Sequence, residues 1–171
     1  MKIHLIRHAE AVDRSSEIEE DHRYLTPKGR SRFREVASTL KKSDMAPKLI
    51  VTSPLVRAVQ TADILAEELD YEGELVLSSE VGPGFSPTRL RKLLDRYHEA
   101  SEIAFVGHEP DLGGVTGRLL DIGHCSLTKG MAITVKISGD GSAQFVQMVT
   151  GGGKLVKSRD QAVSRLSKGE E

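Results

Sequence analysis

Short runs of apolar residues alternate along the chain with longer segments in which apolar residues recur every three or four positions. The short runs predict buried β-strands, and the longer segments predict amphipathic helices. The predicted strands span residues 3–6, 48–52, 75–77, 103–106, 131–135 and 144–149. The predicted helices span residues 27–41, 87–98 and about 110–119, and a further helix starts at Ser53-Pro54. Strands that alternate with helices indicate crossover connections and a parallel sheet covered on both faces.

The last two predicted strands are joined by a turn, Ser138-Gly139-Asp140-Gly141, which predicts an antiparallel hairpin. We therefore expect an α/β fold of three layers, α/β/α, with a mainly parallel central sheet and a C-terminal antiparallel hairpin. Residues 1–153 are expected to form a single domain. Residues 154–171 are charged, and they fit either a mobile C-terminal tail or a short docked helix.

One long segment, residues 9–25, interrupts the alternation of strands and helices. It is polar and acidic and predicts a loop over the end of the first strand. Loops of this length in compact domains are often functional, although a solvated acidic loop is an equally good interpretation. The segment ends where Thr26 is expected to cap the next helix, with Pro27 at the first helical position.

Composition narrows the classes of partner. Of the 171 residues, 38% are hydrophobic and 29% are charged, and the net charge is −1. This balance gives no electrostatic basis for binding nucleic acid or a membrane surface. No apolar stretch approaches ~20 residues, so no transmembrane helix is expected. The chain starts directly with a strand and lacks the apolar region of a signal peptide, so a cytoplasmic location is expected.

Two arginines and two histidines stand close behind predicted strands. Arg7 and His8 end the first strand, and His108 follows the fourth. Arg57 lies one turn into the helix that follows the second strand. Because the carboxyl ends of parallel strands meet at one edge of a sheet, these residues are expected to share a pocket. Arginine matches phosphate oxygens, and a neutral histidine can attack phosphorus. The pattern therefore favours phosphoryl chemistry.

A metal site is not expected. The histidines include no closely spaced pair of ligands, and the two arginines of the expected pocket would repel a cation. The histidines considered are His4, His8, His22, His108 and His124.

Three segments resemble the signature segments of the histidine phosphatase superfamily, which has a phosphoglycerate mutase-like fold. They are Leu5-Ile6-Arg7-His8-Ala9-Glu10, Ser53-Pro54-Leu55-Val56-Arg57-Ala58-Val59-Gln60-Thr61-Ala62 and Val106-Gly107-His108-Glu109-Pro110-Asp111. A fourth segment, Leu25-Thr26-Pro27-Lys28-Gly29-Arg30, resembles the one that opens the first helix of that family. The short chain and its Arg-His-Ala-Glu start are most similar to the SixA-type phosphohistidine phosphatases.

The resemblance implies a phosphatase that forms a covalent phosphohistidine intermediate and requires no metal or other cofactor. By position, His8 would be the nucleophile, and Arg7 and Arg57 would bind the phosphoryl oxygens. His108 would complete the phosphate pocket and stabilise the transferring group. Water would then hydrolyse the phosphorylated His8, with catalysis resting largely on positioning and charge neutralisation.

The source of a proton for the leaving group stays open. Many members of the family place an acidic residue between the second arginine and the second histidine, where this chain has Glu80. Glu80 is either that acid or a solvated loop residue. A phosphohistidine substrate depends less on an acid, because imidazole leaves more readily than an alkoxide. The residues Glu10, Glu109 and Asp111 are expected to orient a site residue or to cap a helix.

Loop lengths bear on the substrate that the resemblance implies. Phosphoglycerate mutases carry long insertions that enclose a small substrate, whereas only a short segment separates the third and fourth predicted strands here. A shallow pocket is expected, and it would admit phosphohistidine on a protein such as a phosphorelay partner. A small phosphoester is the alternative substrate. A non-catalytic phosphoryl-binding module is less favoured, because all four site residues are present.

Overall fold

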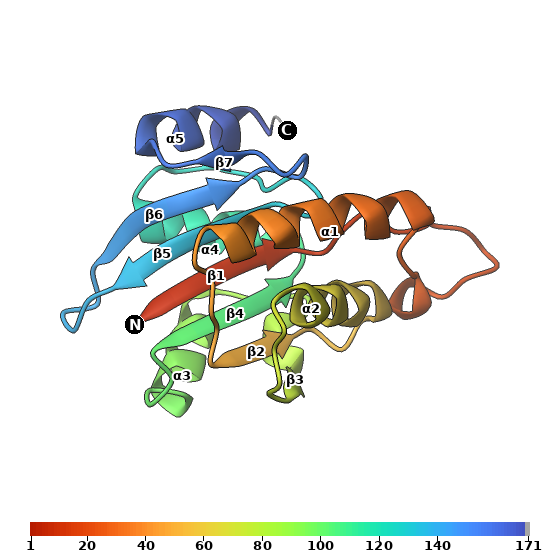
Figure 1. Cartoon of the computed structure of the whole chain (residues 1–171), viewed down its shortest axis with the longest axis horizontal. Helices are drawn as coiled ribbons and strands as arrows, with labels where there is room; N and C mark the ends of the chain where they lie inside the picture. Colours follow the sequence, from red (N-terminus) through yellow and green to blue (C-terminus); the bar gives the residue numbers. More distant parts are fainter. Residues whose placement is uncertain (170–171) are drawn as a thin grey trace.

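The computed structural model describes residues 1–169 as one mixed sheet with helices packed against both faces (Figure 1). The strands are β1 (Lys2–Arg7), β2 (Leu49–Thr52), β3 (Leu75–Leu77), β4 (Glu102–Gly107), β5 (Ala132–Ile137), β6 (Ala143–Val149) and β7 (Leu155–Val156). The helices are α1 (Pro27–Lys42), α2 (Val56–Glu68), α3 (Pro87–Arg96), α4 (Asp111–Leu120) and α5 (Arg159–Lys168). Two short 3-10 helices are η1 (Glu20–His22) and η2 (Ser79–Val81).

The sheet has a parallel half and an antiparallel half, in the order β3-β2-β4-β1-β5-β6-β7. β1 pairs in parallel with β4, and β2 pairs in parallel with β4 and β3. On its other side β1 pairs antiparallel with β5, and β6 and β7 continue antiparallel. The predicted α/β fold with a C-terminal antiparallel hairpin is confirmed. The sheet is more evenly mixed than the sequence predicted, because β5 pairs directly with β1 and the two-residue β7 extends the antiparallel half.

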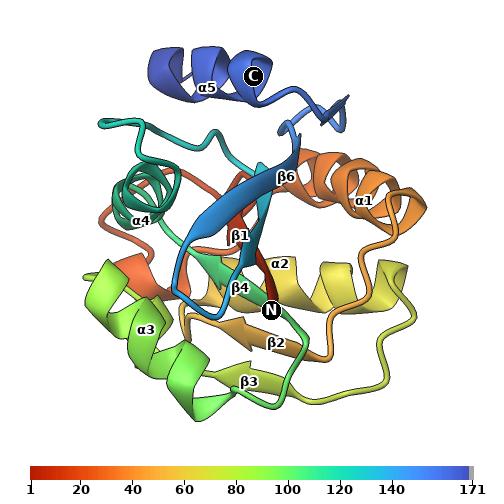
Figure 2. The ribbon, with the colours of Figure 1, turned by 90° about the vertical axis from the view of Figure 1, so that its left-hand side faces the viewer.

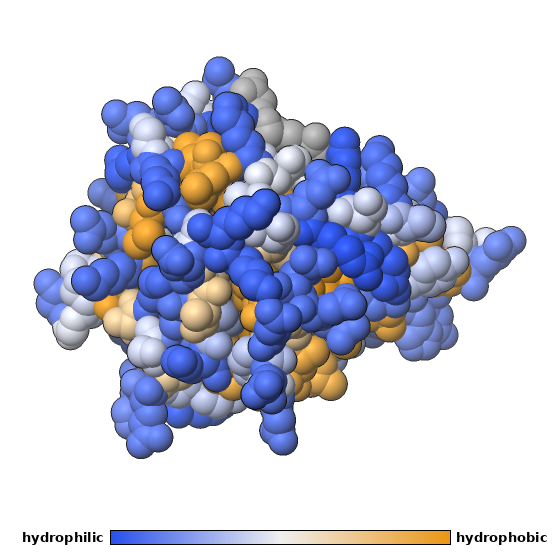
Figure 3. Space-filling view, viewed as in Figure 1, coloured by the Kyte–Doolittle hydropathy of each residue, from blue (hydrophilic) through white to orange (hydrophobic). Residues whose placement is uncertain are grey.

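Helices α1 and α2 cover one face of the sheet, and α3 and α4 cover the other (Figure 2). On β1, Ile3 and Leu5 pack into the cluster beneath α3, α4 and α5, whereas Ile6 packs beneath α1 and α2. This alternation is the two-residue period of a strand that is buried on both faces. Polar residues cover most of the surface of the α1 side (Figure 3). None of the helices formed by residues 1–169 combines the length and the apolar character that a membrane crossing requires.

The second helix begins later than the sequence predicted, so Arg57 lies nearer to its start than expected. Leu55 has an extended backbone (φ −66°, ψ 135°), and its N–H donates to the Ser53 hydroxyl at 3.3 Å. Residues 53–55 therefore form a turn, and α2 begins at Val56. Arg57 is the second residue of α2 and does not lie a full turn inside it. This turn brings Arg57 close to the strand ends.

The C-terminal segment packs against the rest of the chain as far as the structure describes it. The Ser158 hydroxyl accepts the N–H of Gln161 and caps α5. Ala162 and Leu166 on α5 are buried in the core. The Leu166 carbonyl also accepts the N–H of Ser126 at 3.0 Å. Residues 155–168 thus form β7 and a docked α5, and residues 170–171 of the expected tail or helix lie outside the described residues.

Candidate active site

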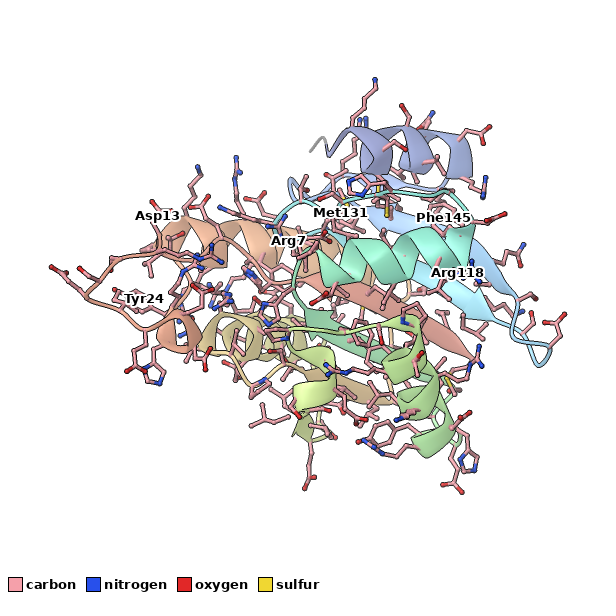
Figure 4. The ribbon with its side chains drawn as sticks, turned by 180° about the vertical axis from the view of Figure 1, so that it is seen from behind. Arg7, Asp13, Tyr24, Arg118, Met131 and Phe145 are labelled. Carbon is pink, nitrogen blue, oxygen red and sulfur yellow. The ribbon has the colours of Figure 1, made fainter. Side chains whose placement is uncertain are left out.

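The three segments that carry the predicted site residues meet at the carboxyl ends of β1 and β4. Arg7 ends β1, and the N–H of His8 donates to the carbonyl of Gly107 at the end of β4 (3.0 Å). The N–H of Arg7 donates to the Met131 carbonyl (3.0 Å), and Figure 4 shows the two residues together. The imidazole rings of His8 and His108 lie with their centroids 5.1 Å apart. Residues that are 100 positions apart in the sequence therefore share one site.

The nitrogens of His8 have different roles. Nδ1 lies 2.7 Å from the Ala9 carbonyl oxygen. A carbonyl can only accept a hydrogen bond, so Nδ1 carries the proton and Nε2 keeps its lone pair. Burial lowers the pKa of His8 to about 3, and the nearby His108, Arg57 and Arg7 contribute to the shift. His8 is therefore a neutral imidazole at neutral pH, with Nε2 available as a nucleophile.

A hydroxyl ties the segment after His8 to the first turns of α2. The Ala9 N–H donates to Thr61 Oγ1 at 3.1 Å, and Thr61 Oγ1 donates to the Arg57 carbonyl at 2.7 Å. Thr61 is fully buried. This link fixes the spacing between His8 and the helix that carries Arg57.

His108 is held by a serine from the turn before α2. Its Nε2 lies 2.7 Å from Ser53 Oγ, and its Nδ1 is buried without a hydrogen-bond partner. Burial lowers the pKa of His108 to about 4, with a further contribution from Arg57. Without a bound anion His108 is therefore neutral. An oxyanion beside it would favour the protonated form.

The two arginines are anchored at one end of their guanidinium groups. Arg7 Nη1 donates to the Leu127 carbonyl at 2.6 Å. Arg57 Nη1 donates to the Glu20 carbonyl at 2.7 Å, and its Nη2 donates to Glu20 Oε1 at 3.0 Å. The Nε atoms of both arginines are buried and have no partner. Each guanidinium thus keeps a buried Nε–H donor without a partner, while both Nη atoms of Arg57 are engaged by Glu20.

The unsatisfied polar atoms of the protein concentrate at this site. Among residues 1–169, five buried side-chain polar atoms have no hydrogen-bond partner: Arg7 Nε, Arg57 Nε, His108 Nδ1, Thr116 Oγ1 and Thr128 Oγ1. Three of them belong to the predicted site residues. A buried donor without a partner typically costs about 1–3 kcal/mol, so such groups are rare unless a ligand satisfies them. An oxyanion would supply the missing acceptors.

The acidic residues considered as proton donors or positioning groups lie around this cluster. Glu80 on η2 forms an ion pair with Arg96 (Oε2 to Nη1, 2.5 Å). It also lines a surface depression of about 420 Å³ that includes Pro54 and Leu55, the residues that follow Ser53. Glu80 therefore lies near the turn that carries Ser53, but none of the four predicted site residues lines this depression, and the role of Glu80 as the acid stays a prediction.

The other three carboxylates bind neighbouring segments. Glu109 Oε1 accepts the N–H of Leu127, whose carbonyl anchors Arg7. Burial raises the pKa of Glu109. Asp111 Oδ2 accepts the N–H of Gly84 at 2.7 Å and so connects α4 to the loop before α3. Glu10 Oε1 accepts from the Thr26 hydroxyl at 3.0 Å, next to the start of α1.

Sequence reasoning missed Glu20 and the role of Ser53. Glu20 is one of several acidic residues in the segment 9–25, and nothing in the pattern distinguishes it from Glu19 or Asp21. The sequence pattern identifies Ser53 only as the start of a helix. A serine between a buried strand and the Arg57 helix is the signal that could have placed it beside the site.

Comparisons with known proteins agree on one family and one fold. The family model of the histidine phosphatase superfamily (branch 1) matches residues 3–79. An uncharacterized protein of Picosynechococcus sp. is 37% identical over 119 residues, which are 66% of this chain and 69% of the relative. The structure of the protein histidine phosphatase SixA complexed with tungstate superposes with a TM-score of 0.79 at 20% identity, over 88% of this chain and 97% of that chain. The alpha-ribazole phosphatase from Shigella flexneri gives a TM-score of 0.67 at 18% identity, over 93% and 97% of the two chains.

Proposed function

This chain belongs to the histidine phosphatase superfamily and is a phosphatase, and we propose that His8 is its nucleophile and protein-bound phosphohistidine its substrate. One observation carries the proposal. A neutral imidazole with a free Nε2 lies in a site where two guanidinium groups and a second imidazole have buried nitrogens without partners. Such a site offers a nucleophile to phosphorus and donors to the phosphoryl oxygens.

The reaction proceeds in two steps. His8 Nε2 forms a bond to phosphorus while the phosphorus–nitrogen bond of the substrate breaks, and the departing imidazole takes up a proton from solvent. Arg7 and Arg57 neutralise the charge on the transferring group, and His108, protonated beside the anion, donates to one of its oxygens. A water molecule then attacks phosphorus and gives up a proton to solvent, the bond to Nε2 breaks, and inorganic phosphate leaves with the oxygen of that water.

The substrate class is supported by the open surroundings of the site. Between β3 and β4 the chain forms only η2 and α3, so no long insertion covers the strand ends from this side of the sheet. A surface depression lined by Pro54 and Leu55 adjoins the turn that carries Ser53, and the side chain of another protein can approach the turn there, although none of the four proposed site residues lines this depression. The fold shared with a SixA protein histidine phosphatase agrees with this choice. A small phosphoester is the second candidate, because Glu80 lines that depression and could protonate an alkoxide.

The test compares hydrolysis of a phosphohistidine protein and of an aryl phosphate by the wild type, His8→Ala and His98→Ala. We expect the wild type to hydrolyse phosphohistidine, and we expect His8→Ala to lower the rate by roughly 10⁴-fold or more, because the nucleophile is gone. His98 is exposed, so His98→Ala is the matched control and should keep the wild-type rate.

Each other outcome changes the proposal in a defined way. Near-wild-type activity of His8→Ala would contradict the covalent mechanism. Activity on the aryl phosphate alone would assign the enzyme to small phosphoesters. Binding of inorganic phosphate by a wild type that turns over neither substrate would favour a phosphoryl-binding module.

A further inference from the structure

Glu20 places a carboxylate against one of the arginines that the proposed mechanism assigns to the phosphoryl group. Besides its bond from Arg57, this carboxylate accepts from Arg23 Nη1 at 3.0 Å and from Arg14 Nε at 3.0 Å. Three guanidinium groups therefore converge on one carboxylate. The hydrogen bond from Arg14 contributes most to lowering the pKa of Glu20, so this side chain is ionised at neutral pH.

The segment that carries Glu20, residues 11–25, is hydrogen-bonded at its two ends and exposed to solvent between them. At the ends, Ala11 and Leu25 form a β-bridge, and the N–H of Val12 donates to the Tyr24 carbonyl at 2.9 Å. Most side chains of residues 13–22 are exposed, and the Glu20 side chain is 42% exposed. The segment extends past the helices in Figure 4, where Asp13 and Tyr24 mark its two sides. Segments with few buried contacts open at low cost, so the carboxylate can move while the fold stays intact.

We propose that Glu20 is an internal counter-anion that competes with the phosphoryl group of the substrate for Arg57, and so determines how tightly the pocket binds anions. This inference rests on the proposed function, in which Arg57 binds phosphoryl oxygens. Arginine binds oxyanions through paired N–H groups, and here the Glu20 carboxylate accepts from Nη2 of Arg57 while the Glu20 backbone carbonyl accepts from Nη1. A phosphoryl group with two negative charges would meet the Glu20 carboxylate at short range, and like charges repel.

Arg14 and Arg23 can remain paired with the Glu20 carboxylate when it leaves Arg57. Arg14 and Arg23 both lie on the Glu20 segment, and Arg23 is anchored there because its Nε donates to the Val12 carbonyl at 2.8 Å. When a phosphoryl group takes Arg57, Arg14 and Arg23 keep the Glu20 carboxylate paired. The exchange therefore leaves no charge of this cluster without a counterion.

The orientation of Arg57 does not depend on the Glu20 carboxylate alone. Arg57 Nη1 also donates to the backbone carbonyl of residue 20 at 2.7 Å, and any side chain at this position keeps that carbonyl. Glu20→Gln therefore removes the negative charge while it keeps a backbone anchor and an amide oxygen of similar reach. The substitution separates competition by charge from the holding of Arg57 in place.

The experiment measures the Ki of inorganic phosphate and the KM of the phosphohistidine protein for the wild type, Glu20→Gln and Glu19→Gln. For Glu20→Gln we expect both constants to fall roughly three- to tenfold at low ionic strength, because a nearby like charge is gone. The difference should shrink as salt is added, since exposed charges are screened. Glu19 is 81% exposed and, within residues 1–169, forms its ion pair with His22 and none with Arg57, so Glu19→Gln should match the wild type and serves as the control.

Other results separate this inference from the proposed function. A Ki of Glu20→Gln equal to the wild-type value would overturn the competition, and a raised Ki would make Glu20 an anchor for Arg57 instead. Arg57→Ala is measured beside it. If Arg57→Ala loses phosphate binding while Glu20→Gln changes nothing, only this inference fails. If Arg57→Ala binds phosphate like the wild type, the phosphate pocket of the proposed function is wrong. Thermal unfolding of each variant checks that it is folded.

Discussion

Strand β1 has a buried histidine near its amino end and another just past its carboxyl end, and the two differ in how they are satisfied. His4 Nδ1 lies 2.8 Å from Thr134 Oγ1, and its Nε2 lies 2.9 Å from Glu102 Oε1. Glu102 also binds Lys2 at 2.9 Å and accepts the N–H of Ala46 at 2.7 Å. Every polar group of this amino-end cluster has a partner from the protein itself.

At the carboxyl end, one nitrogen of His8 donates to the carbonyl of the next residue. Its neighbours have polar atoms without hydrogen-bond partners. The buried atoms without partners include nitrogens of Arg7, Arg57 and His108, and none of them belongs to the His4 cluster. A fully satisfied buried network stabilises one conformation, whereas an unsatisfied one carries a free-energy cost that a ligand can remove. The comparison sets a buried histidine whose two nitrogens both have protein partners against one whose neighbours lack them, and it predicts that the first serves stability and the second serves binding.

The largest effect that would test this difference is on catalysis at the carboxyl end. Arg57→Ala removes a preorganised donor from the phosphoryl group, so we expect kcat/KM for the phosphohistidine protein to fall roughly 10²–10³-fold. The free energy of unfolding should change little, because the removed guanidinium had an unpartnered Nε and its partner, the Glu20 carboxylate, keeps Arg14 and Arg23. Steady-state kinetics and urea unfolding measure the two quantities.

The matched control for that substitution is Arg34→Ala on the exposed side of α1. Arg34 forms ion pairs with Glu67 and Glu68 at the surface, and such pairs contribute at most about 1 kcal/mol. Its kcat/KM should equal the wild-type value. If Arg57→Ala kept the wild-type kcat/KM and lost stability instead, the carboxyl-end cluster would be structural like the amino-end one.

A substitution in the amino-end cluster should lower stability and leave kcat/KM unchanged. Glu102→Ala leaves the buried His4 Nε2 without its partner and removes the acceptor of the part-buried Ala46 N–H, so we expect the free energy of unfolding to drop by about 2–3 kcal/mol. Because Glu102 lies at the opposite end of the strands from His8, kcat/KM of the folded variant should stay at the wild-type value. A large loss of kcat/KM at full stability would show that the two ends of β1 are coupled.

The sequence predicted the strands and the convergence of Arg7, His8 and His108 for a definite physical reason. Each follows an apolar run, and parallel strands bring their ends to one edge. The role of Glu20 was out of reach, because several acidic side chains in one loop are chemically alike until a tertiary contact with Arg57 selects one. Long-range pairing was equally hidden: the Ser53 hydroxyl reaches His108 across 55 positions.

The smallest of the predicted effects is on how the free energy of unfolding depends on pH. It tests whether burial lowers the pKa of the carboxyl-end histidine as it does that of the amino-end one. Burial lowers the pKa of His4, and it lowers that of His8 to about 3 and that of His108 to about 4, each from an ordinary value of 6.5. Below pH 6.5 the unfolded chain therefore binds more protons than the folded one. Stability should fall as the pH falls from about 6.5 towards the folded values.

Each such histidine contributes at most about 1.4 kcal/mol per pH unit to this slope. His8→Ala removes one of them, so its free energy of unfolding should depend on pH less steeply than that of the wild type, by about 1 kcal/mol per unit between pH 6 and pH 5. Urea unfolding at several pH values measures the slope, and His98→Ala, which removes an exposed histidine, is measured beside it as the control. An unchanged slope in His8→Ala would mean that His8 is protonated as easily in the folded enzyme as in water, and it would then lack the neutral Nε2 on which the proposed nucleophilic attack depends.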